Sequence, residues 1–167
     1  MSKSEKVGGW STVVEIAPTV VAEAYAANDV LGSDSPLSLT PAIRLVSTPK
    51  NLIGTGTIVN IMVTDKAAQT AEMDIVFWDT NPSSTTFTNN TALTVNDTDL
   101  LNIIGVVTID TWTSFAASSV GRPTAAVAIP FKLASGATTL YAAMITRGTP
   151  TYASTSDLLL RVGIYQD

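Results

Sequence analysis

The sequence of 167 residues contains no cysteine and no histidine. Disulfides, Cys/His zinc sites, thiol nucleophiles and Ser-His-Asp triads are therefore excluded. Charge is also scarce, because 14% of the residues are charged, against about a quarter in an average soluble protein. The nine lysines and arginines are scattered and the net charge is −5, so the basic stripe of a nucleic-acid-binding protein is missing and we expect no nucleic-acid partner.

Long hydrophobic runs are absent as well. Thr, Asp or Gly interrupts each apolar stretch well before the ~18 residues that a membrane-spanning helix needs. The N-terminus, MSKSEKVGGWSTVVEI, lacks the apolar core of a cleaved signal peptide. We therefore expect a soluble protein without a membrane partner, with a flexible arm over residues 1–9 and one domain over residues 10–167.

The apolar stretches that are present are short, rich in Val, Ile, Thr and aromatics, and separated by Gly, Pro, Asn, Asp and Ser. This pattern is typical of many short strands, so we predict an all-β fold, an antiparallel β-sandwich. The strands are expected near residues 12–16, 19–25, 42–47, 57–64, 71–78, 103–109, 124–131, 138–146 and 157–165.

Two polar loops between consecutive strands predict β-hairpins. One is VTDKAAQTAE, which joins the strands near 57–64 and 71–78. The other is LASGATTL, in which Ser135 and Gly136 separate two runs and glycine supplies the positive φ of a tight turn.

One short helical turn is predicted in VNDTDLLNII. Asn96 can cap its N-terminus, and two aspartates follow in the first turn, where the helix dipole favours acids. Leu100, Leu101 and Ile104 would form its apolar side.

The stretch FWDTNPSSTTF places two aromatic residues side by side on a strand. Neighbouring side chains on a strand point to opposite faces, so Phe77 and Trp78 cannot enter the same core. Phe77 shares a face with Met73 and Ile75, which makes it a core residue. We expect Trp78 to be covered either by the following loop, residues 79–91 with Phe87, or by another subunit.

The sequence contains few indications of a ligand-binding or catalytic site. Aspartates and asparagines around Asp74, Asp79 and Asp97 offer oxygen ligands, but no EF-hand pattern occurs, so we predict no metal and no cofactor. Sequence spacing singles out no carboxylate pair for glycoside hydrolysis, so we predict that the protein is not an enzyme. The tryptophans and tyrosines could instead form a carbohydrate-binding platform.

Two motifs carry a resemblance to a known group of proteins. They are F-W-D-T-N-P-x-x-T-T-F, followed by A-L and D-x-D-L, and the closing R-G-T-P-T-Y-A-S-x-S-D-L. The sequence over these motifs resembles a family of small virion proteins encoded with the structural genes of tailed bacteriophages. The match spans roughly the second half of the chain and part of the first, and residues 1–31 show no resemblance.

The resemblance implies a capsid decoration, or cement, protein with a jelly-roll-like β-sandwich. Such a protein would sit on the outer capsid surface after assembly in the host cytoplasm, with the major capsid protein and copies of itself, commonly as trimers, as partners. The residues that we expect at its contacts are Trp10, Trp78, Pro82, Phe87 and Tyr152. Packing inside the domain is the alternative for each residue, and a receptor- or glycan-binding module of a head or tail fibre is the alternative function.

Overall fold

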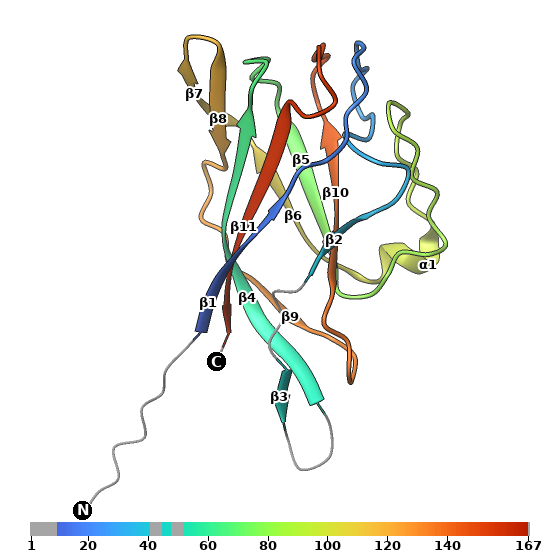
Figure 1. Ribbon diagram of the computed structural model, residues 1–167. Helices are drawn as coiled ribbons and strands as arrows, with labels where there is room; N and C mark the ends of the chain where they lie inside the picture. Colours follow the sequence, from blue (N-terminus) through green and yellow to red (C-terminus); the bar gives the residue numbers. More distant parts are fainter. Residues whose placement is uncertain (1–9, 41–44, 48–51, 167) are drawn as a thin grey trace, which may run out of the picture.

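The computed structural model describes residues 10–40, 45–47 and 52–166, which form an almost entirely β structure (Figure 1). The predicted arm, residues 1–9, and the first part of the strand predicted over 42–47 lie outside these residues. The elements are β1 (Trp10–Ile16), β2 (Leu37–Leu39), β3 (Leu45–Ser47), β4 (Leu52–Asp65), β5 (Met73–Trp78), α1 (Asp97–Leu100), β6 (Ile103–Ile109), β7 (Thr111–Phe115), β8 (Ser118–Arg122), β9 (Ile129–Lys132), β10 (Leu140–Thr146) and β11 (Leu158–Gln166).

These strands form two antiparallel sheets. The large sheet has the order β1-β11-β4-β8-β7, with β3 and β9 also paired to β4, and the small sheet has the order β2-β10-β5-β6. In Figure 1 the large sheet lies in front of the small one, as two layers. The predicted all-β antiparallel sandwich is confirmed, while the jelly-roll connectivity stays a prediction.

The main core lies between the two sheets. Alternate residues of β4 and β11, such as Ile61 and Val162, face Met73, Ile75 and Phe77 of β5. All five side chains are fully buried. Burial of each contributes roughly 1.5–3 kcal/mol, so this alternation is the principal source of the stability of the fold.

Both predicted hairpins are wrong, because the strands that they were to join belong to different sheets. β4 lies in the large sheet and β5 in the small one, and β9 and β10 are divided in the same way. The turn at Ser135 and Gly136 does form, with Gly136 at φ +80° and the Ala137 N–H donating to the Ala134 carbonyl oxygen. This turn leads the chain from the large sheet to the small sheet, and it does not join two paired strands of one sheet.

Most other differences between the predicted and the observed strands concern short strands. Residues 19–25 form no strand in the structure, whereas β2, β7 and β8 were not predicted. Their sequences, LSL, TWTSF and SSVGR, are short or polar, so alternation gives little signal.

The predicted helical turn is confirmed as α1. Asn96 is its N-cap, and the Asn96 side chain accepts a hydrogen bond from the Thr98 N–H at 3.0 Å. Its apolar side was predicted wrongly, because Leu100 and Leu101 are exposed and Asp99 is the residue that the turn buries. Among the described residues, no helix is long and apolar enough to cross a membrane.

Candidate functional site

A lid, defined as residues 79–96, covers the outer face of the small sheet. A second apolar cluster forms there, outside the main core, and Trp78 and Phe87 are its aromatic members. Val76 and Ile145 form the sheet side of the cluster, and Leu93 packs against it. The second aromatic of FWDTNPSSTTF is therefore covered by a segment of the same chain.

Trp78 is held under the lid by two specific contacts. Its ring meets the edge of Phe87 at a centroid distance of 6.1 Å and an interplanar angle of 87°. Its indole Nε1–H donates to the Asp99 carbonyl oxygen at 3.0 Å. The Asp99 carboxylate in turn accepts hydrogen bonds from the Ser84 N–H and the Thr85 hydroxyl, at 2.9 and 2.8 Å. Helix α1 and the lid therefore fix each other around the tryptophan.

Asn89, in the second half of the lid, connects the lid to the N-terminal part of the chain by hydrogen bonds. Its side-chain NH₂ donates to the Thr19 carbonyl oxygen at 2.7 Å, and its side-chain oxygen accepts from the Tyr25 hydroxyl at 2.8 Å. Its backbone N–H donates to Asp34 Oδ1 at 2.8 Å. These contacts join segments more than 50 residues apart in sequence, so the lid is part of the folded domain.

Four of the five residues expected at contacts with other chains are buried within this one. They are Trp78, Pro82, Phe87 and Tyr152. The structure thus places them in the alternative role, packing inside the domain, because a side chain without exposed surface cannot meet a partner. Trp10 differs, since 38% of its surface is exposed.

Tyr152 is the buried aromatic residue of the loop RGTPTYAS. Its ring packs edge-on against Tyr25 at a centroid distance of 5.7 Å. Burial raises the pKa of the Tyr152 phenol well above its usual value, and the negative charge of Asp65 adds to this increase. Tyr152 is consequently neutral at physiological pH and belongs to the core.

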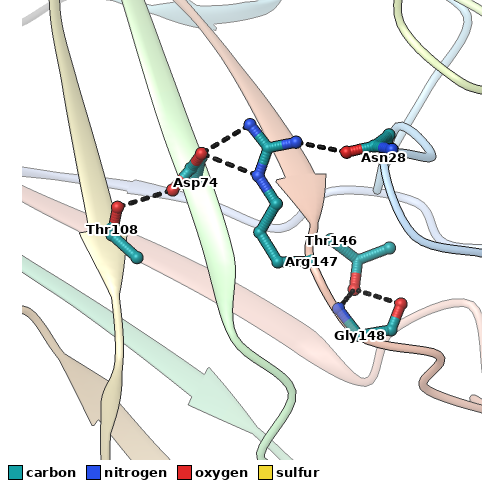
Figure 2. A network of polar contacts seen from close by, with 6 residues as sticks. All are labelled: Asn28, Asp74, Thr108, Thr146, Arg147 and Gly148. Atoms are coloured by element: carbon teal, nitrogen blue, oxygen red, sulfur yellow. Dashed lines mark hydrogen bonds and ion pairs between the residues drawn. The ribbon is translucent and has the colours of Figure 1, made fainter.

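Asp74 belongs to a network of polar contacts at the margin of the small sheet (Figure 2). The Asp74 carboxylate on β5 accepts from the Thr108 hydroxyl of β6 at 2.6 Å and forms an ion pair with Arg147 at 2.6 Å. The same guanidinium donates to the Asn28 side-chain oxygen. The network joins β5, β6, the end of β10 and the loop that contains Asn28, and these contacts indicate a structural role.

Asp74 and Asp79 do not form the carboxylate pair of a glycoside hydrolase. They lie five residues apart along β5 and its end, which at about 3.3 Å per residue corresponds to roughly 16 Å. Glycosidase carboxylates lie about 5–9.5 Å apart. In the part of the chain that the structure describes, no group of three or more acids is placed to hold a metal ion.

The outer face of the large sheet is the candidate contact surface, defined here as Val13, Val59, Gly163 and Tyr165. Val13 is 61% exposed, Val59 48% and Tyr165 42%. Val13 on β1 lies opposite Gly163 on β11, which lies opposite Asn60 on β4. The register shift between β4 and β11 at this point leaves Val59 unpaired and exposed.

The centre of this surface is a shallow hollow of about 300 Å³, lined mostly by apolar atoms. Gly163 forms part of its floor, and a Cβ atom at that position would come within 3.0 Å of the Asn60 Cβ. Glycine therefore leaves the hollow open where β11 approaches β4 closely.

Two charged side chains of this face are paired with each other. Glu15 and Arg161 are paired in the β1–β11 register and form an ion pair of 2.7 Å. Such an exposed pair contributes little to stability, but the two side chains neutralise each other. Trp10, at the start of β1, lies an odd number of residues from Val13 and opposite the buried Gln166, so it belongs to the core-side face of the strand and not to this surface.

No protein-family model and no curated protein matches this chain.

Sequence reasoning missed Val13, Val59 and Tyr165, because they lie on three different strands. One local signal does exist in TIVNIMV, where buried Ile58 and Ile61 are three residues apart and Val63 follows at the usual spacing of two. This break in alternation indicates a bulge, and a bulge turns one additional side chain outward.

A second hollow, of about 320 Å³, has a mixed polar and apolar lining. It lies where the loop after β5 meets the loop between β9 and β10, and Asp79, Asn81, Thr138 and Tyr141 line part of it. Tyr141 is half-buried on β10, opposite Trp78 in the register of the small sheet. An aromatic ring beside a carboxylate and an amide can stack on a sugar and bind its hydroxyls.

Proposed function

We propose that this protein is a non-enzymatic virion protein of a tailed phage, which decorates the outer capsid surface and stabilises the shell by bridging major capsid subunits. The candidate contact surface supports the proposal. The lid covers Val76, Trp78 and Ile145 on the outer face of the small sheet, whereas the corresponding face of the large sheet is open and apolar at its centre. Depletion of charge around exposed apolar and aromatic residues is typical of the centre of a protein–protein interface.

A cement protein acts by mass action. Binding to the assembled shell, but not to the separated subunits, stabilises the shell according to the occupancy of its sites. A rigid sandwich with one open face suits this function, because little conformational entropy is lost when a preorganised surface binds. The sequence motifs that resemble phage virion proteins add the capsid as the partner, and they imply a homo-oligomer, commonly a trimer.

The proposal is tested by mixing the purified protein with undecorated capsids and imaging the particles. The wild-type protein is expected to add stoichiometric density at symmetry-related positions. Val13→Lys should weaken binding at least tenfold, because it would bury an unpaired ammonium group in the interface. Thr86→Lys is the matched control, since Thr86 is exposed on the lid above the other sheet, and this variant should bind as the wild type does.

Absence of any density on the shell would overturn the proposal. Equal loss of binding in both lysine variants would show that net charge, rather than this face, controls attachment. Light scattering on the free protein tests the oligomer separately, and a monomer both in solution and on the shell would contradict the trimer.

The glycan-binding alternative is favoured by a different observation, the hollow in which Asp79 and Asn81 lie beside Tyr141. It predicts that the isolated protein binds host polysaccharide and that Asp79→Ala weakens this binding while shell attachment is unchanged. Isothermal titration with the purified polysaccharide measures the first effect, and absence of heat with the wild-type protein would remove this alternative.

A further inference from the structure

A slot separates the β6 edge of the small sheet from residues 123–128, the connection that leads from β8 to β9. Its volume is about 430 Å³, far more than the ~30 Å³ share of a single water molecule. Val106 and Val107 line the β6 side, and Ala125, Ala126 and Val127 line the other side. Val106 and the two alanines are exposed, so the slot opens to solvent.

Both ends of the slot are closed by specific contacts. At one end the Asp110 carboxylate accepts a hydrogen bond from the Thr124 N–H at 2.8 Å. At the other end Ile129 packs onto Gly105 so closely that a Cβ atom there would lie 2.7 Å from the Ile129 Cδ1 atom. Because β6 and the connection over residues 123–128 are fixed to each other at these points, the space between them is held open by the fold.

The β6 side of the slot is an unpaired strand edge. In the described residues β6 pairs with β5 alone, so alternate N–H and C=O groups of its other edge face the slot. Edge strands usually carry a lysine, a proline or an inward-pointing charge that prevents pairing with another chain. The sequence of β6, IIGVVTI, contains none of these.

The chemistry of the slot specifies what fits it. The side chains that line it are small or apolar apart from Thr108 and the carboxylate of Asp110. Hydrogen bonds from Thr124 lower the pKa of Asp110, so its carboxylate is ionised at neutral pH. A segment that runs antiparallel to β6 would place its N-terminal end beside Asp110, since this residue directly follows the C-terminus of β6.

We propose that this slot binds an extended segment of a partner polypeptide, which adds a strand to β6, with small or β-branched apolar residues in the middle and a lysine or arginine at its N-terminal end. Main-chain hydrogen bonds to a strand edge would supply affinity, and the apolar walls and Asp110 would supply selectivity. This proposal does not rest on the capsid assignment, because the slot lies on β6 and the candidate contact surface lies on β1, β11 and β4.

The experiment uses the full-length protein and a synthetic peptide, acetyl-KVTVAV-amide, followed by isothermal titration and amide hydrogen exchange. We expect saturable binding and at least tenfold slower exchange of some N–H groups of residues 106–108. Two further peptides have methylated backbone amides. One is methylated at the three valines, and the other at the threonine and the alanine. Since these sets of amides lie on opposite edges of a strand, at least one methylated peptide should bind at least tenfold more weakly.

Ala126→Phe tests the location of the peptide, because the larger side chain would fill the slot. It should weaken peptide binding at least tenfold, whereas Ala134→Phe, at an exposed position in the loop between β9 and β10, should leave it unchanged. Failure of the unmethylated peptide to bind, or equal binding of all three peptides, would overturn the proposal. Self-association of the free protein that Ala126→Phe abolishes would also overturn it and assign the slot to a second copy of the chain.

Discussion

Trp78→Ala is expected to lower the free energy of unfolding by about 3–5 kcal/mol, the usual cost of removing a buried tryptophan. The indole is fully buried beneath the lid, against Phe87, and its N–H has a hydrogen-bond partner in the Asp99 carbonyl. Truncation would leave a cavity between the lid and the small sheet and would leave that carbonyl without its partner. Urea unfolding followed by circular dichroism measures the change.

Trp10→Ala is the control for this prediction. Trp10 is partly exposed at the start of β1, so its removal should change the free energy of unfolding by no more than about 1 kcal/mol. If Trp78→Ala were as stable as the wild-type protein but bound capsids weakly, the side chain would belong to an interface between chains instead.

Asp65→Ala is expected to lower the free energy of unfolding by about 3 kcal/mol, since hydrogen bonds to a charged group contribute roughly 1.5–3 kcal/mol each and are not additive. The fully buried carboxylate at the end of β4 accepts from the N–H groups of Ala67, Gln69 and Thr70, at 2.9, 2.8 and 3.1 Å. Thr70 has a φ of +51°, which is unfavourable for a β-branched residue. The carboxylate therefore stabilises a strained crossing from the large sheet to the small one.

Glu72→Ala changes the net charge by the same amount in the same loop, but Glu72 is exposed, so a change within about 0.5 kcal/mol is expected. Amide exchange provides a second measurement, because the N–H groups of Ala67, Gln69 and Thr70 should exchange faster in Asp65→Ala. Unchanged exchange together with wild-type stability would show that the backbone holds this loop without the carboxylate.

The position of Trp78 changes which residues can take part in assembly. The conspicuous aromatics of FWDTNPSSTTF are used inside the domain, where the lid and the small sheet bury them. Among the exposed apolar residues, Val13, Val59 and Tyr165 are ordinary members of strands that share one face of the large sheet. A search for contacts should accordingly begin at the large sheet.

Several features followed from the sequence because their causes are local. A short stretch rich in Val, Ile and Thr predicted the bounds of β6, and alternation with a period of two placed Phe77 and Trp78 on opposite faces. The side-chain oxygen of Asn96 predicted the start of α1, since capping depends on residues three or fewer positions away. Phe87 was one of two explanations for the cover of Trp78, and the structure selects it.

What the sequence by itself determined is the all-β class, the alternation of buried and exposed residues, and the exclusion of cysteine and histidine chemistry. Tertiary structure alone decided which sheet each strand joins, which is why both predicted hairpins became crossings between sheets. It also decided that Pro82 and Tyr152 are buried and that Val13, Val59 and Tyr165 meet on one face. The reason is physical: periodicity fixes the direction of a side chain relative to its own strand, but burial depends on which distant segment packs against that face.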